Sequence, residues 1–166
     1  MSKRIREELH IAKQHWKNYV FQSLLATLSV FCVLIFLEQE EEVIIASLGA
    51  TAFVVFALPD KITAQPRNVI GGHIVGMVCG MIGFQTLTLF PDPDFFIAES
   101  AIHALAVGLS IFIMVLINTE HPPAAGTALG VAIQGLSYRL ALSILFFAFV
   151  FTFIRLRLRK HLRDLT

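Results

Sequence analysis

The residues best suited to chemistry lie in one short stretch, residues 118–127, between two apolar segments. The stretch contains an acid, an imidazole, two prolines and a glycine, in the order Glu120, His121, Pro122, Pro123 and Gly126. Imidazole and carboxylate groups can hold or move a proton, and ionisable residues at membrane depth are usually functional. Proline lacks an N–H and is favoured in the first turn of a helix. The two prolines therefore predict the start of a helix at a break in an apolar span.

The elements that must position this stretch are those of a membrane protein. Hydrophobic residues make up 56% of the 166 residues and charged residues 15%, whereas soluble domains average about 45–50% and about 25%. This composition excludes an ordinary soluble domain and predicts an all-α integral membrane protein. The sequence contains no Ser-His-Asp order, phosphate-binding glycine loop or His-Glu-x-x-His signature, so we expect neither an enzyme nor a cofactor.

Six apolar segments are predicted to cross the membrane, and two of them are short. A basic amphipathic segment, residues 1–19, precedes them and is expected to lie on the membrane surface, with Trp16 and Tyr19 in the headgroup layer. A transmembrane domain (20–158) and a basic tail (159–166) follow. The predicted segments are 20–37, 43–58, 68–90, 98–117, 122–136 and 140–158.

The basic residues predict the orientation of the chain. With six crossings, every Lys and Arg except Arg139 lies on one side, which the positive-inside rule assigns to the cytoplasm. A re-entrant fifth segment would instead place the basic C-terminus outside. We therefore expect six crossings and cytoplasmic termini in a bacterial inner membrane or its equivalent. Basic residues beside a span give no reason to expect nucleic-acid binding.

The segments divide into two sets of three with opposite orientation, which predicts a 3+3 inverted repeat. Aligning residues 49–52 with 126–129 pairs the two short segments. A helix of about fifteen residues spans only about 22 Å, so one end of each must lie below the headgroups. We expect the N-termini of these two helices to converge near the midplane and to bind a small anion through free backbone N–H groups.

The residues expected to bind or gate the substrate surround these two helix starts. They are Ser47, Gly49, Ala50, Thr51, Pro66, Arg67, Asn68, His73, Glu120, His121, Pro122, Pro123, Gly126 and Thr127. His121 is either an anion contact or proton donor, or it caps a turn at the interface. Glu120 is either a proton-coupling group or an interfacial carboxylate, and Arg67 either guards the inner mouth or is a positive-inside residue. His73 lies deep enough that we expect it to face a cavity or another polar group.

Glycines predict the packing of the third segment. Gly72, Gly76 and Gly80 recur at steps of four, a spacing that lets two helix backbones approach closely. Six short helices enclose little interior, so we expect a homo-oligomer in the lipid bilayer that packs through this face or through the first segment.

Two alternatives to anion transport remain open. A divalent metal transporter would use Glu99 and His103, four residues apart on one helix, together with Glu120 and His121. A hydrogen-bonded structural contact accounts for the Glu99–His103 spacing as well. The other alternative is a membrane scaffold or regulatory subunit that transports nothing and binds a partner through the glycine face.

Three motifs in order resemble the HPP family of integral membrane proteins. They are residues 46–52 (ASLGATA), residues 65–68 (QPRN) with 71–73 (GGH), and residues 121–127 (HPPAAGT). The resemblance covers nearly all of the chain after about residue 15. Family members in chloroplasts and cyanobacteria are associated with nitrite transport, so the resemblance implies a small monovalent anion as substrate. Family members are usually described with four spans.

Overall fold

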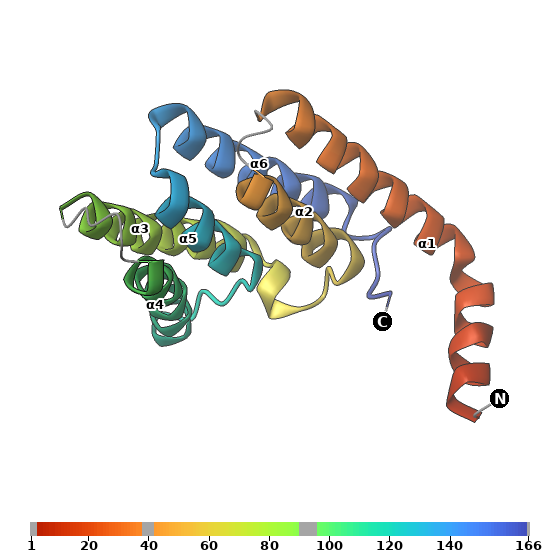
Figure 1. Ribbon diagram of the computed structural model, residues 1–166. Helices are drawn as coiled ribbons and strands as arrows, with labels where there is room; N and C mark the ends of the chain where they lie inside the picture. The colour runs from red at the N-terminus through yellow and green to blue at the C-terminus, as the bar shows by residue number, and fades with distance from the viewer. Residues whose placement is uncertain (1–2, 38–41, 90–95, 166) are drawn as a thin grey trace.

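The computed structural model describes residues 3–37, 42–89 and 96–165, and these residues form helices without any strand (Figure 1). The six α-helices and one 3₁₀ turn confirm the predicted all-α membrane fold. Their starts and ends agree closely with the predicted segments, except that α1 begins at Lys3 and joins the predicted surface segment to the first span. They are α1 Lys3–Phe36, α2 Glu42–Ala57, η2 Ile62–Ala64, α3 Pro66–Leu89, α4 Phe96–Leu116, α5 Pro123–Gln134 and α6 Tyr138–Leu158.

Four helices are long and apolar enough to cross a membrane: Lys13–Phe36 within α1, α3, Ile97–Leu116 within α4, and α6. The protein is therefore a multi-pass integral membrane protein. The other two helices are short, as predicted: α2 has 16 residues and α5 has 12. At 1.5 Å per residue they are about 24 Å and about 18 Å long. Gly135, with φ 80°, ends α5 earlier than the apolar run suggests.

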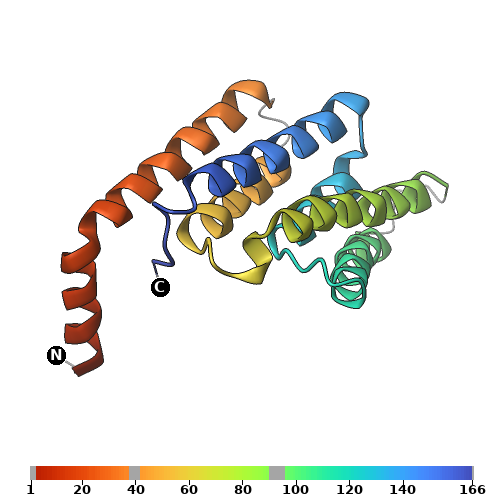
Figure 2. The ribbon, with the colours of Figure 1, turned by 180° about the vertical axis from the view of Figure 1, so that it is seen from behind.

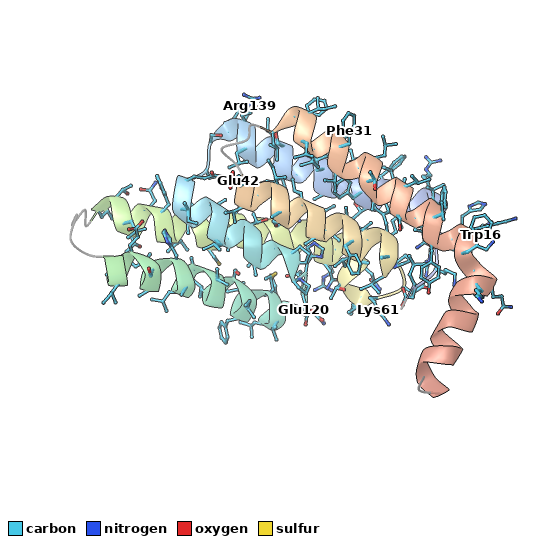
Figure 3. All side chains as sticks on the ribbon, turned by 45° about the vertical axis from the view of Figure 1, so that its right-hand side comes forward. Trp16, Phe31, Glu42, Lys61, Glu120 and Arg139 are labelled. Atoms are coloured by element: carbon cyan, nitrogen blue, oxygen red, sulfur yellow. The ribbon has the colours of Figure 1, made fainter. Side chains whose placement is uncertain are left out.

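The helices run side by side between two ends of the bundle. Trp16, Lys61 and Glu120 lie toward one end, and Glu42 and Arg139 toward the other (Figure 3). We call the first the basic end, because α6 finishes there with the basic residues that follow it. The segments joining α2 to α3 and α4 to α5 also lie at the basic end. The predicted alternation of six segments is therefore present, with two of the six too short to span alone.

The outer helices are α1 and α4, which lie at opposite margins of the bundle (Figures 1 and 2). Only 17% of the residues in the most apolar stretch of α1, and likewise of α4, are buried, compared with 50% in α3. The large exposed apolar side chains on these two helices suit contact with lipid. The interior is therefore built mainly by α2, α3, α5 and the buried face of α6.

The helix neighbours follow the pattern that a 3+3 repeat predicts. α1 packs on α2 as α4 packs on α5, and α3 packs on α5 as α6 packs on α2. The contact between α3 and α4 likewise has its counterpart between α6 and α1, while α2–α5 and α3–α6 contacts join the halves. The arrangement agrees with the predicted inverted repeat.

The helix α1 bends at His15, where the backbone leaves the helical region (φ −116°, ψ 19°). The part before the bend turns away from the bundle (Figure 2). A break near this position suits a surface segment joined to a span. The interfacial location of residues 1–19 stays a prediction.

The residues after α6 fold back onto the helices at the basic end. Tyr19 Oη donates to the Leu165 carbonyl (2.8 Å), and the Leu165 N–H donates to the carbonyl of Ala57 (2.9 Å). Lys61 Nζ lies 3.2 Å from a carboxylate oxygen of Asp164. The tail therefore ties the middle of α1 to the end of α2.

The glycine stripe of α3 packs against α5 of the same chain. A Cβ on Gly76 would collide with the carbonyl oxygen of Ala124, and one on Gly80 would lie 2.5 Å from that of Ala128. The stripe is thus a helix-packing face, as predicted. It is not open to a second copy, because α5 already covers it, so the expectation that a homo-oligomer packs through this face is wrong. The homo-oligomer itself stays a prediction.

Replacing Gly76 with alanine is expected to destabilise the fold, because the added methyl group meets backbone that cannot move without separating α3 from α5. Overpacking of this kind costs about 1–3 kcal/mol. The matched control is Gly108→Ala on α4, where nothing lies within 4 Å of the added Cβ. Thermal unfolding in detergent should show a lower midpoint for Gly76→Ala and an equal or higher one for Gly108→Ala, since alanine favours helix. Equal midpoints for the two variants would contradict the close contact.

Candidate functional site

The middle of the bundle holds a group of five buried polar side chains, which we call the central network. Its members are Ser47 and Thr51 of α2, His73 of α3, His121 of the α4–α5 loop, and Thr127 of α5. Ser47 is 4% exposed and the other four are fully buried. Buried polar groups are tolerated only when they are hydrogen-bonded, so the partners of each atom matter.

The hydroxyl group of Thr51 lies between the two imidazoles. Its Oγ1 is 3.0 Å from Nε2 of His73 and 3.1 Å from Nε2 of His121. The ring centroids of the two histidines are 5.2 Å apart, edge to face. On the other side of its ring, Nδ1 of His73 lies 2.9 Å from Oγ1 of Thr127. The network thus runs continuously from the loop through α2 and α3 to α5.

Backbone carbonyls hold the network at both ends. Ser47 Oγ lies 2.6 Å from the carbonyl oxygen of Pro123 and 2.9 Å from Oγ1 of Thr127. His121 Nδ1 lies 2.8 Å from the carbonyl oxygen of Thr63, in η2. A carbonyl can only accept, so Ser47 and Nδ1 of His121 are donors.

Burial favours the uncharged form of the His121 imidazole. Burial lowers its pKa to about 4, against the smaller opposing effect of the hydrogen bond to Thr63. With its proton on Nδ1, the ring presents Nε2 to Thr51 as an acceptor.

The antiparallel packing of α2 and α5 brings the hydroxyls together. Gly126 faces Ser47, with 3.2 Å between a Cβ built there and that of Ser47, and Gly130 faces Ile44 further along. Ser47 and Thr51 are four residues apart and so lie on one face of α2. The absence of a side chain at Gly126 lets the two helices approach at the level of the network.

The glycine stripe of α3 places His73. A Cβ atom added to Gly72 would lie only 2.7 Å from Cβ of His121, so α3 packs directly on the loop before α5. His73 follows Gly72 and enters the space between α2 and α5. The sequence predicted that His73 faces a polar group, and this is confirmed.

The predicted convergence of two helix N-termini is wrong. α2 begins at Glu42, so Ser47 and Thr51 lie inside the helix and their amides belong to its hydrogen-bond ladder. At the start of α5, the amides of Ala124 and Ala125 donate to the carbonyls of the preceding turn (2.9 and 3.1 Å). Since α2 and α5 lie antiparallel, their N-termini point to opposite ends of the bundle. Side chains, and not backbone N–H groups, form the centre of the site.

The other residues of α2 and α5 that were predicted to bind or gate the substrate lie mostly outside the central network. Gly49 faces α1, where its nearest atom is a methyl carbon of Val30 at 4.0 Å, and Ala50 is exposed. Pro122 is exposed, while Pro123 begins α5 and supplies the carbonyl that Ser47 binds. Gly49, Ala50 and Pro122 are therefore outside the central network. The prolines do start the helix, as predicted.

A second polar group lies at the basic end, where α3 begins with Pro66. Arg67 Nη2 donates to the carbonyl of Ile117 (2.8 Å), and Asn68 Nδ2 donates to the carbonyl of Glu120 (3.2 Å). An oxygen of the Glu120 carboxylate is 3.5 Å from the same Asn68 nitrogen. These contacts fix the α4–α5 loop against α3, so Arg67, Asn68 and Glu120 hold His121 in place from outside the network.

The residues that a metal site would need do not lie close together. Glu99 and His103 lie in the first turns of α4, whereas Glu120 and His121 follow its end. From His103 to Leu116 the helix rises about 20 Å, which separates the pairs. Within residues 3–37, 42–89 and 96–165 no three His, Cys, Asp or Glu side chains are grouped as metal ligands.

The sequence analysis did not predict the two backbone carbonyls that anchor the central network, nor the buried side chain of Thr119 beside it. The carbonyl of Thr63 and that of Pro123 have no signature in a sequence. Thr119 is buried, packs on Gly71, and has no partner for its hydroxyl among the described residues. The Gly71-Gly72 pair was the available signal, because adjacent small residues indicate a close approach by another segment.

Comparison with known proteins adds a family and two relatives. The family model described as "HPP, transmembrane region" matches residues 11–158. A transmembrane protein of Dictyostelium discoideum is 36% identical over 103 residues, which cover 62% of this chain and 34% of that protein. A second transmembrane protein of the same organism is 35% identical over 92 residues, or 55% of this chain and 28% of the relative. The chain thus spans about a third of each relative's length. No solved structure matches the chain.

Replacing Thr51 with valine is expected to destabilise the protein, because the change keeps the shape of the side chain but leaves both histidine Nε2 atoms without their partner. Buried groups that lose a partner cost about 1–3 kcal/mol each. The matched control is Thr27→Val on exposed α1, where the hydroxyl bonds only to its own helix. Unfolding midpoints in detergent should fall for Thr51→Val and stay close to wild type for Thr27→Val. A Thr51→Val midpoint equal to that of the control would show that the network contributes no stability.

Proposed function

The chain belongs to the HPP transmembrane family, and from this premise we propose that it is a transporter for a small monovalent anion, with nitrite as the first candidate substrate, and not an enzyme. The orientation proposed with it places both termini and the basic end in the cytoplasm, because nearly all Lys and Arg residues lie there.

The central network is the observation that carries this proposal. Each of its hydroxyl and imidazole groups carries a proton that an entering anion would accept in place of the present partner, and within the described residues no carboxylate is hydrogen-bonded to the network. Such neutral donors suit a small anion, because they bind a negative charge without the strong attraction that would trap it. A cation site at this depth would instead need carboxylates or several carbonyls.

The basic end supports the approach of an anion. Arg67 is exposed there, close to the loop that carries His121, and Lys61 is exposed nearby. A separate open pocket of about 500 Å³ lies between α1 and the tail, and its basic lining residues include Lys17, Lys160 and Arg163. Clustered positive charge raises the local concentration of anions. The substrate would meet this surface before it reaches the network.

Alternatives are less well supported. The metal transporter requires ligands that lie at opposite ends of α4. The scaffold alternative requires an open glycine face, and α5 covers that face. Neither gains a specific observation from the fold.

Nitrite uptake by reconstituted protein tests the proposal. Wild-type protein in vesicles is expected to take up nitrite faster than protein-free vesicles, with nitrate, formate and chloride as competitors. Thr127→Val removes one donor from the network and should reduce uptake about tenfold or more, since a lost hydrogen bond of about 1.4 kcal/mol corresponds to a factor of ten.

Thr27→Val serves as the control and should transport as wild type does. Correct insertion of each variant is checked by its elution as a single species in detergent. Uptake equal to that of protein-free vesicles for every anion tested would overturn the proposal, and full activity in Thr127→Val would remove the network from the pathway.

A further inference from the structure

The central network contains too few protons for the hydrogen bonds it forms, and we propose that it binds one proton together with the anion, which makes the protein a proton–anion symporter. The identity of the second ion rests on the proposed function. The proton deficit itself follows from the positions of the five side chains.

The two carbonyl anchors use the first two protons. Ser47 donates to Pro123, and His121 donates from Nδ1 to Thr63, because neither carbonyl can donate in return. With both imidazoles neutral, one proton remains on Thr51, one on Thr127 and one on His73. Three protons are therefore left for the rest of the network.

Four contacts remain for these three protons. They join Ser47 to Thr127, Thr127 to His73, His73 to Thr51, and Thr51 to His121, at 2.9, 2.9, 3.0 and 3.1 Å. Each contact needs one proton between its two heavy atoms. In the neutral state one contact lacks a proton. A further contact of Thr51, to the carbonyl of Ser47 at 3.0 Å, competes for the same hydroxyl proton.

One additional proton completes the four contacts. On His73 it lets both ring nitrogens donate, one to Thr51 and one to Thr127; Thr127 then donates to Ser47, and Thr51 donates to His121. The same proton on His121 works equally well, because Nε2 then donates to Thr51, which donates to His73 in turn. The heavy atoms stay in place in both arrangements.

The hydroxyl group of Thr51 therefore passes a proton between the two imidazoles. It accepts a proton from one ring while it gives its own to the other, so no net charge stays on the threonine. His121 follows the loop at the basic end, and His73 lies on α3 in the interior. The three groups form a route by which a proton from the basic end reaches the interior.

The anion supplies the charge that a buried imidazolium needs. An isolated buried cation is strongly disfavoured unless an opposite charge lies close by. α5, α4, α6 and the two loops pack on α3, and Thr51 of α2 contacts His73; the described charged or titratable side chains of these elements, apart from the cysteine thiol of α3, are Glu42, Asp60, Lys61, Arg67, Glu99, His103, Glu120, His121, Tyr138, Arg139, Arg155 and Arg157.

Of these groups, only His121 is a member of the network. Glu120 reaches Asn68, Arg155 donates to the carbonyl of Pro59, and Lys61 pairs with Asp164. Glu42, Glu99 and Arg139 begin helices at the end of the bundle opposite the basic end. The protein thus provides no counter-charge at the network among its described residues, so an entering monovalent anion stabilises the added proton, and each ion favours the binding of the other.

Proton movement during anion uptake tests this inference. Vesicles with wild-type protein and a pH-sensitive dye inside should acidify when nitrite or nitrate is added outside, with one proton entering per anion. Nitrate serves beside nitrite because its acid is strong, so it carries no proton across protein-free vesicles. A symporter of this stoichiometry moves no net charge, and an imposed potassium diffusion potential should leave its rate unchanged. Thr51→Ser keeps the hydroxyl and should keep acidification; Thr51→Val should lose it.

Two measurements separate failure of this inference from failure of the proposed function. Anion uptake that responds to the imposed potential and brings no acidification overturns the symport and leaves anion transport intact. The ¹⁵N NMR signals of labelled histidine in lipid nanodiscs give an answer even where no uptake occurs. At pH 7, saturating nitrite should convert one imidazole to the doubly protonated form. If both network histidines stay singly protonated with nitrite and with nitrate, the proton site does not exist.

Discussion

The close contact between α3 and α5 determines the interior of this protein. Three glycines at steps of four bring the backbone of α3 against that of α5, and the histidine that follows the first glycine is thereby carried into the middle of the bundle. At that depth no water satisfies an imidazole. The neighbouring helices must therefore provide partners, and α2 and α5 do so with hydroxyl groups. Packing and polar chemistry at the centre are consequences of the same contact.

The sequence was sufficient to predict the elements and insufficient to predict how they meet. Apolar runs, paired prolines and flanking charges located six helices to within a few residues, because each depends on local properties of the chain. The free backbone N–H groups expected near Ser47 and Thr51 are absent, because both residues lie inside α2. The small residues at this level allow α5 to pack closely on α2. A serine in a helix interior and one at its start have the same local sequence.

The partners in the central network are far apart in the chain. Thr51, His73 and His121 are separated by 22 and 48 further positions in the sequence, and nothing local to any of them indicates the other two. His73 was recognisable by its depth in an apolar segment, and His121 by its prolines. Their joint contact with Thr51 depends on the antiparallel order of α2 and α5. The same lack of long-range information explains why Glu99 and His103 suggested a metal site with His121. The spacing of two residues on a helix does not indicate whether a third residue, in a loop, lies near the same end of that helix.

The turn after α5 has a mechanical consequence. Only residues 135–137 join α5 to α6, and Gly135 holds the positive φ that ends the shorter helix. Gly135 is therefore one end of a helix about 18 Å long, and the central network lies toward its other end. At that other end, Arg67 and Asn68 hold the preceding loop against α3, and the backbones of α3 and α5 are in contact. Any displacement of α5 that opens the network must therefore also break the contact between α5 and α3.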